Sequence, residues 1–132
     1  MIRGSCLCGE VRYEIAGELR SITHCHCSMC RKAHGAAFAT YAEARSRDLR
    51  FSAGEQLISR YRSSEASQRS FCSRCGSNLL FECDETPDLV YVAAGGVDSL
   101  LQLRPSSHIF VGSKAPWFDI NDDLPRHEAD SA

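Results

Sequence analysis

The 132-residue sequence has no long apolar run and no strong excess of one charge. Its longest apolar stretches, such as residues 89–94, are far shorter than the roughly 20 residues that a membrane-spanning helix needs. Residues 1–5 carry no apolar segment behind the charge of Arg3, so we expect no secretory signal and a cytoplasmic location. The formal net charge of −2 gives no general attraction to nucleic acid or to an anionic membrane, so neither is an expected partner.

Sustained helical periodicity is also lacking. No segment keeps a helical pattern of apolar residues for three turns, and no internal repeat is present. Val11, Tyr13 and Ile15 instead alternate with polar residues, as in a half-buried strand. Further strands are expected at residues 38–41, 49–51, 58–61, 79–81, 89–92 and 108–111, and short helices at 29–34 and 98–103. The pattern predicts one mainly β domain of short antiparallel strands over residues 1–125, with a disordered tail over 126–132.

Cysteine, by contrast, is abundant, with eight residues in the chain. A cytosolic protein keeps its thiols reduced, so closely spaced cysteines there are typical of metal sites rather than disulfides. Because four thiolates close one tetrahedral zinc site, seven grouped cysteines leave three for a second site. We therefore expect two zinc ions per chain, with iron as the alternative metal, because tetrahedral thiolate sites accept both. The groups are Cys6-x-Cys8, Cys25-x-Cys27-x-x-Cys30 and Cys72-x-x-Cys75.

Two of these groups have the pattern of half a metal site each. Cys72 and Cys75 form a zinc knuckle, in which the backbone turns tightly between the two thiolates and Gly76 permits that turn. Cys6 and Cys8 are followed by Gly9, which lets the chain curl so that both sulfurs reach one ion. If the two pairs share an ion, they close a long loop, where a cross-link constrains the unfolded chain most.

The third group, at residues 25–30, is unusual because three thiolates come from six residues. His24 and His26 alternate to the opposite face, so they are poorly placed to ligate, and one of them is expected to orient the ligands instead. The fourth ligand must come from solvent or from elsewhere in the chain, with Cys83 the first candidate and His34 the second.

An open centre with three thiolates points to particular chemistry. Zinc there carries a net charge of −1, so it is a poor generator of hydroxide and is better suited to holding a sulfur ligand or polarising a carbonyl. Positive charge for an anionic thiol would come from Arg31 and Lys32. Elsewhere, His108 is expected to be a structural histidine and Trp117 a core residue.

Four blocks of the sequence resemble the glutathione-dependent formaldehyde-activating family, which shares its domain with centromere protein V. They are residues 4–13 (GSCLCGEVRY), 25–32 (CHCSMCRK), 71–77 (FCSRCGS) and 108–117 (HIFVGSKAPW), in the family's order. The resemblance implies a β-tent fold, in which small antiparallel sheets lean over zinc. It implies a structural zinc held by Cys6, Cys8, Cys72 and Cys75. It also implies a catalytic zinc with an open position, held by Cys25, Cys27 and Cys30.

The implied activity is that of a carbon–sulfur lyase, which reversibly joins an aldehyde to glutathione to give an adduct like S-hydroxymethylglutathione. Its partners would be a small aldehyde or thiol, with glutathione as co-substrate. The alternative is a non-catalytic module, stapled by zinc, that binds protein or nucleic acid through an arginine-rich middle region. That region contains Arg45, Arg47, Arg50, Arg60, Arg62, Arg69 and Arg74.

Overall fold

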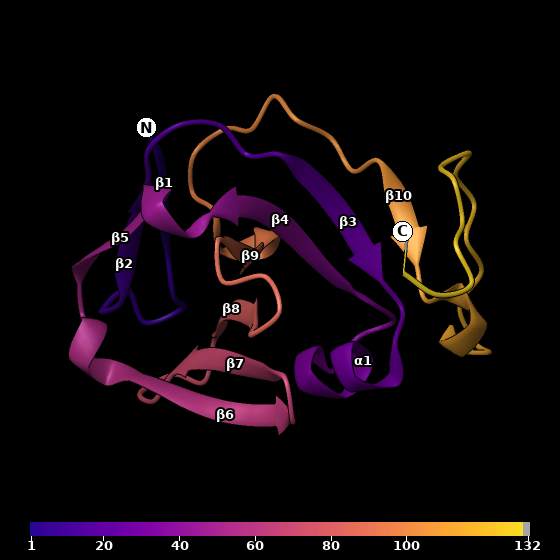
Figure 1. The fold of residues 1–132 in the computed structure, drawn as a ribbon, viewed down its shortest axis with the longest axis horizontal. Helices are drawn as coiled ribbons and strands as arrows, with labels where there is room; N and C mark the ends of the chain where they lie inside the picture. Colours follow the sequence, from indigo (N-terminus) through magenta and orange to yellow (C-terminus); the bar gives the residue numbers. More distant parts are fainter. Residues whose placement is uncertain (131–132) are drawn as a thin grey trace.

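The structure is a computed structural model that describes residues 1–130, and its strands form two sheets (Figure 1). The smaller sheet has the order β1-β2-β5, with β1 at Ile2–Ser5, β2 at Arg12–Ile15 and β5 at Leu49–Ala53. The larger sheet has the order β10-β3-β4-β9-β8-β7-β6. Its strands are β3 Ser21–Cys25, β4 Ala39–Arg45, β6 Ile58–Ser64, β7 Ser67–Cys72, β8 Asn78–Cys83, β9 Leu89–Ala93 and β10 Ser107–Ile109.

The strand pairing confirms the predicted mainly β fold of small, largely antiparallel sheets. All pairs within the two sheets are antiparallel except β10 with β3, which is parallel. Short 3₁₀ turns connect several strands: η1 Ser46–Asp48, η2 Glu55–Leu57, η3 Ala94–Gly96 and η4 Val111–Ser113. No helix among residues 1–130 is long and apolar enough to cross a membrane.

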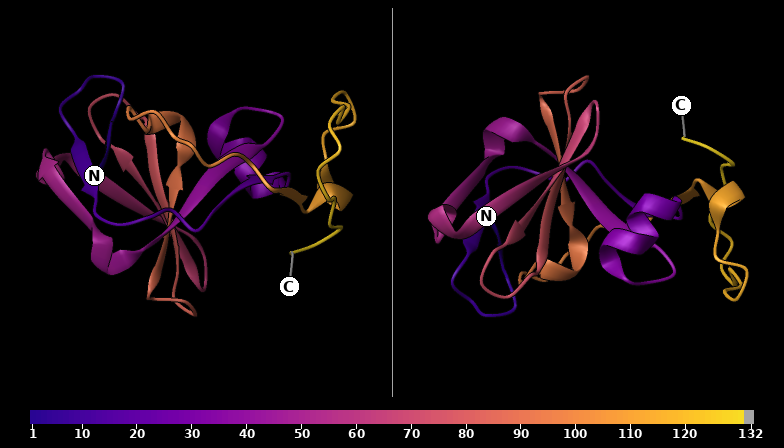
Figure 2. Two further views of the ribbon diagram at one scale, coloured as in Figure 1. Left: turned by 90° about the horizontal axis from the view of Figure 1, so that it is seen from above. Right: turned by 90° about the horizontal axis from the view of Figure 1, so that it is seen from below.

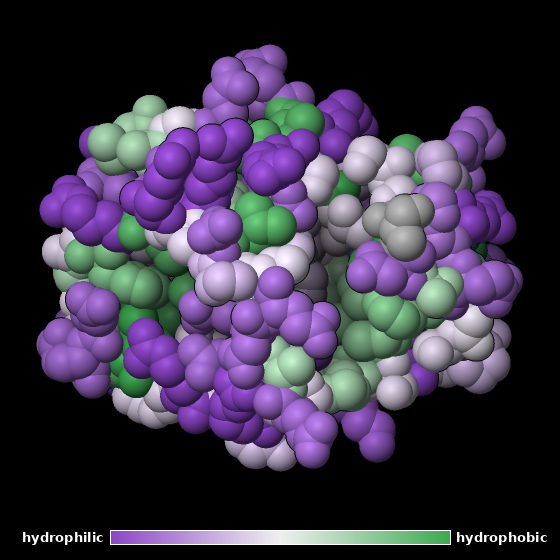
Figure 3. Space-filling view, viewed as in Figure 1, coloured by the Kyte–Doolittle hydropathy of each residue, from purple (hydrophilic) through white to green (hydrophobic). Residues whose placement is uncertain are grey.

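The main core lies between the two sheets. In β2 the side chains of Tyr13 and Ile15 are buried while Arg12 is exposed, so the alternation seen in the sequence directs one face of this strand inward. These residues pack with apolar side chains of β8 and β9, including Leu80 and Val92. On the face seen in Figure 3, hydrophilic side chains cover most of the surface and apolar ones gather in separate patches.

One α-helix, α1 at Ser28–His34, confirms the helix predicted over residues 29–34. It begins at Cys27, whose sulfur accepts a hydrogen bond from the backbone N–H of Cys30 at 3.2 Å. It ends at Gly35, which adopts the left-handed conformation with φ 59°. The N-terminal cap of this helix is thus one of the predicted metal ligands.

The helix predicted over residues 98–103 is wrong. The backbone N–H groups of Asp98 and Ser99 both donate to the carbonyl oxygen of Arg3, which holds this segment against β1. The Ser5 hydroxyl also donates to the Asp98 carboxylate at 2.6 Å. These contacts tie the start of the segment to β1, and residues 98–103 contain no helix.

The end of the described chain packs beside β10, far from the N-terminus (Figure 2). The sequence predicts a disordered tail from Arg126, but the structure gives residues 126–130 defined backbone contacts. The N–H of His127 donates to the carbonyl of His108, and its carbonyl accepts from the N–H of Val111. The remainder of that predicted tail, residues 131–132, lies outside the described residues.

Trp117 corrects another expectation, because 71% of its surface is exposed rather than buried in the core. Its neighbours Ala115 and Phe118 face the protein instead: Ala115 is fully buried, and the ring of Phe118 packs 5.4 Å from that of Phe38.

Candidate metal centres and the adjoining cavity

The first cysteine cluster contains four residues whose sulfur atoms all lie within 4.8 Å of one another. Cys6 and Cys8 come from the turn between β1 and β2, Cys72 ends β7, and Cys75 lies in the turn between β7 and β8. The sulfurs of Cys6 and Cys8 are 3.5 Å apart. Tetrahedral zinc with bonds of about 2.3 Å requires sulfurs about 3.8 Å apart, so the spacing fits such an ion. The cluster contains Cys6, Cys8, Cys72 and Cys75.

The two glycines after these pairs shape the cluster as predicted. Gly9 and Gly76 have φ of 79° and 80°, and each donates its N–H to the carbonyl three or four residues earlier, at Cys6 and Cys72 respectively. A hydrogen bond with the Ser77 hydroxyl is the main cause that lowers the pKa of Cys75 to about 5. A thiolate is the form that ligates metal, so the lowered pKa favours ligation by Cys75.

The second cluster contains Cys25, Cys27 and Cys30, whose sulfurs also lie within 4.8 Å of one another. Cys25 ends β3, Cys27 caps α1, and Cys30 lies in its first turn, so the strand-to-helix turn gathers all three. The sulfurs of Cys25 and Cys30 are 3.3 Å apart. Hydrogen bonds from Cys25 and Cys30 lower the pKa of Cys27 to about 2, and the contact with Cys27 raises the pKa of Cys25.

Neither predicted fourth ligand joins this cluster. Within residues 1–130, the metal-ligating groups gathered at this point are the three cysteines alone. The Nε2 atom of His34 forms a hydrogen bond of 3.0 Å with the hydroxyl of Tyr41 and is not among the gathered ligand atoms. Cys83 lies at the end of β8, opposite Ser67 of β7, and is outside the group. The described donors therefore suit a metal with one coordination position left over.

The second cluster opens onto a cavity of about 450 Å³. All three cysteines line it, together with the aromatic side chains of Tyr41, Phe81 and Tyr91. A cavity of this size, largely apolar with a few polar groups, is typical of small-molecule sites. A second hollow of about 590 Å³ lies beside Cys6 and Asp98, but no cysteine of the second cluster lines it. The first cluster thus reaches a hollow through Cys6 alone, whereas all three cysteines of the second cluster line their cavity.

Arg69, on β7, is a feature of this site that sequence reasoning missed. The sequence places it with six other arginines in a basic region, but its side chain is buried against the second cluster. Its Nη1 donates to the Tyr41 hydroxyl at 2.8 Å, its Nη2 lies 3.6 Å from the sulfur of Cys30, and its guanidinium stacks 4.9 Å from the Phe81 ring centre. No local signal marks it, because these partners come from β4, α1 and β8.

A chain of histidines lies on the other side of the ligand loop. Nε2 of His26 is 2.8 Å from Nδ1 of His108, and Nε2 of His108 is 2.9 Å from the carboxylate of Asp122. Burial lowers the pKa of His26 to about 4. His24 and His26 stay outside the metal cluster, as the alternation predicts. The backbone N–H of His26 also donates to the carbonyl of Ile109. Because His26 lies between Cys25 and Cys27, this network holds the backbone between these two cysteines in place.

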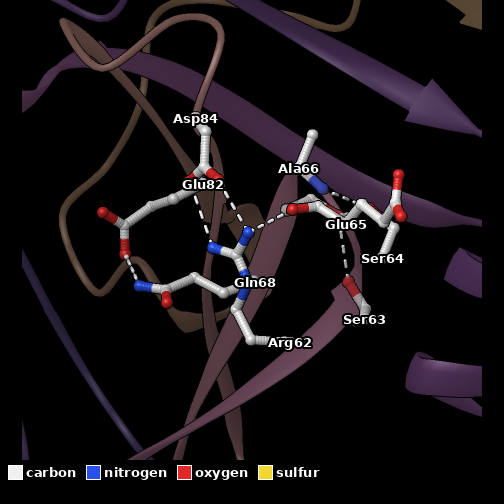
Figure 4. A network of polar contacts seen from close by, with 9 residues as sticks. Arg62, Ser63, Ser64, Glu65, Ala66, Gln68, Glu82 and Asp84 are labelled. Atoms are coloured by element: carbon white, nitrogen blue, oxygen red, sulfur yellow. Dashed lines mark hydrogen bonds and ion pairs between the residues drawn. The ribbon is translucent and has the colours of Figure 1, made fainter.

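Three of the six other arginines of the basic region form ion pairs within the chain: Arg50, Arg62 and Arg74. Figure 4 shows Arg62 between the Asp84 carboxylate and the Glu65 carbonyl. Arg50 pairs with Glu14, and Arg74 with Glu10 at 3.6 Å. Half of these six arginines are therefore paired with carboxylates of the chain.

Comparison with known proteins gives a consistent result. The model of the glutathione-dependent formaldehyde-activating enzyme family matches residues 1–113. A Halomonas elongata protein named for that activity is 30% identical over 127 residues, covering 91% of this chain and 81% of the relative. A Schizosaccharomyces pombe protein named as an uncharacterised lyase is 27% identical, covering 88% and 82%. A crystal structure of a Rhodobacter sphaeroides protein matches with a TM-score of 0.63 at 27% identity, covering 76% of this chain and 91% of that one.

Proposed function

Because this chain belongs to the glutathione-dependent formaldehyde-activating family, we propose that it is a zinc-dependent enzyme of the carbon–sulfur lyase type. Its substrate is a small adduct of an aldehyde with a thiol, with glutathione as the thiol co-substrate. The observation that carries this proposal is the second cluster, where three cysteines line a cavity and, among the described residues, no fourth ligand joins them.

The two clusters have different roles, one structural and one catalytic. The four-cysteine cluster has enough donors to close a tetrahedral ion and joins two sheets, which suits a structural zinc. The three-cysteine cluster at Cys25, Cys27 and Cys30 is the catalytic centre. A zinc ion held by these three cysteines would act there as a Lewis acid toward the sulfur of the thiol or the oxygen of the aldehyde.

The chain's own residues position the reactants around this centre. Condensation forms a bond between the thiol sulfur and the carbonyl carbon, and the thiol proton ends on the carbonyl oxygen, so no oxidant or reductant is needed. The aromatic side chains of Tyr41, Phe81 and Tyr91 shape the cavity and reduce its water content, which favours the adduct over the hydrated aldehyde. The Asp122–His108–His26 chain holds the ligand loop in place.

The test combines metal counting with turnover. Native mass spectrometry of the purified chain should find two zinc ions, and glutathione should add to the loaded protein. Because thiols add to formaldehyde without a catalyst, NMR exchange spectroscopy should compare the interconversion rate with the uncatalysed rate. We expect acceleration by the wild type and by Cys83→Ser, and none by Cys25→Ser. Equal rates with and without the wild-type protein would reject the enzyme.

The alternative of a nucleic-acid-binding module has less support, because Arg50, Arg62 and Arg74 are paired and Arg69 is buried. It predicts nucleic-acid affinity that falls steeply as salt rises. We expect no measurable binding even at low salt.

A further inference from the structure

Arg69 is the only basic side chain among the described residues that line the three-cysteine cavity. The other charged side chains of that lining are acidic: Glu43, Glu85 and Asp130. Arg31 and Lys32, which the sequence suggests as sources of positive charge, are not part of the lining, and Arg31 donates instead to the carbonyl of Ser113 at 3.1 Å. The positive charge of the cavity lining therefore comes from β7 rather than from the helix that carries the ligands.

The guanidinium of Arg69 is buried, with only 8% of the residue exposed. A guanidinium stays protonated in proteins, and a buried charge is costly unless it is paired. None of the ion pairs formed by the described residues includes Arg69. Its polar contacts are the Tyr41 hydroxyl and the sulfur of Cys30. The group that can balance this charge is thus the thiolate cluster itself.

We propose that Arg69 is the built-in counter-charge of the three-cysteine centre and allows this centre to accept an anionic sulfur as its fourth ligand. This inference rests on the proposed function, because it presupposes a divalent metal at the cluster. Three thiolates around a divalent ion carry a net charge of −1, which repels an incoming thiolate. Arg69 brings the total to zero, so the thiolate of a substrate meets a neutral centre.

The geometry of Arg69 suits this role. Tyr41 accepts from one arm of the guanidinium and Phe81 holds its face, so the second arm is directed at Cys30 with little freedom to turn away. A lysine at this position would keep the charge but lose the fork that reaches both partners. Charge and geometry can therefore be separated by comparing Arg69→Gln with Arg69→Lys.

The experiment uses the full chain loaded with cobalt in place of zinc, because cobalt–thiolate absorption bands report each ligand directly. Metal is counted first, and then 2-mercaptoethanol and imidazole are titrated as anionic and neutral fourth ligands. Arg69→Gln should weaken thiolate binding by about 10- to 100-fold and leave imidazole binding unchanged. Arg69→Lys should restore most of the thiolate affinity. Arg60→Gln, which changes an exposed arginine of β6, is the matched control and should behave as the wild type.

Three results would overturn the inference. Equal thiolate affinity in the wild type and Arg69→Gln would show that the charge does not matter. A parallel loss of thiolate and imidazole binding would assign Arg69 a purely structural role. A wild-type chain that binds a single cobalt ion would reject the proposed function and this inference with it, and the metal count separates that failure from the other two. If Arg69→Gln loses the absorption of the four-cysteine centre, that variant no longer folds correctly and Arg69→Lys becomes the test. If Arg69→Lys still prefers thiolate over imidazole, the proposal is supported. If it has lost that preference, the proposal is contradicted.

Discussion

The sulfur atoms of Cys8 and Cys72 lie 4.0 Å apart, although 64 residues separate them along the chain. Cys8 follows β1 of the smaller sheet, and Cys72 ends β7 of the larger one. A metal ion bound between them would therefore join the two sheets at the edge of the main core, which includes both Cys6 and Cys72. Such a cross-link stabilises the fold, because the unfolded chain loses the freedom of a long loop.

Loss of the four-cysteine site should unfold the domain. Binding of structural zinc contributes about 10–16 kcal/mol, which is comparable to the whole stability of about 5–15 kcal/mol of a small domain. We therefore expect Cys72→Ser to lose its β-sheet circular dichroism and both metal ions. Cys25→Ser should keep the fold and one metal ion, and Cys83→Ser both ions. Equal loss of structure in Cys72→Ser and Cys25→Ser would contradict this division between the clusters.

Gradual removal of metal should occur in two steps. The three-cysteine cluster has fewer protein ligands and lines a cavity that a chelator can approach, so its ion should leave first. A coloured chelator followed by absorbance should take up one equivalent while circular dichroism stays constant, and then a second as the signal is lost. Release of both ions in one step, together with unfolding, would mean that the two sites are not independent.

The turn at Gly54 should tolerate no side chain. Gly54 has φ 74°, and a Cβ there would meet the carbonyl oxygen of Glu10 at 2.1 Å. Glu10 belongs to the segment that follows Cys8 and Gly9, so the clash would also disturb the four-cysteine cluster. We expect Gly54→Ala to lower the free energy of unfolding by about 2–5 kcal/mol, measured by chemical denaturation. Gly95→Ala, where nothing lies within 4 Å of the added carbon, is the control and should change stability little.

The features predicted correctly from the sequence are the local ones. The knuckle turns at Gly9 and Gly76 and the three-cysteine turn follow from spacings of a few residues, and the structure gathers both groups. The strands β1, β3 and β7 were missed, because their short segments mix polar and apolar residues and acquire their pattern only by pairing with distant neighbours.

The residues of the site that the sequence did not reveal were missed for the same reason. Arg69 reaches Cys30 and Asp122 reaches His108 only through contacts between segments far apart in the sequence. Whether a fourth protein ligand completes the three-cysteine centre depends on the positions of Cys83 and His34 in the fold, and the sequence spacing does not determine these positions. Residue type alone predicts Trp117 in the core, but the turn around Pro116 buries Ala115 and leaves the indole exposed.

The contact between His108 and Asp122 should give stability a defined dependence on pH. The hydrogen bond from His108 lowers the pKa of Asp122 below its ordinary value of 3.8. A carboxyl group whose pKa is lower in the folded state stabilises the protein above the unfolded value, and this contribution is lost as pH falls through the folded value. The free energy of unfolding of the wild type should therefore exceed that of Asp122→Asn at pH 7, and the difference should shrink below about pH 3.8.

Acid also releases metal, which should itself unfold the domain, so the two proteins are compared only at pH values where metal counting shows both ions bound. Within that range, the change in the difference as pH falls toward 3.8 isolates the carboxylate. Asp119→Asn, which changes an exposed carboxylate three residues earlier, is the matched control and should follow the wild type throughout. Carbon-13 NMR of the Asp122 carboxyl group gives the same pKa directly. A pKa at or above 3.8, or a difference that persists unchanged into acid, would mean that the bond with His108 does not hold the C-terminal segment against β10.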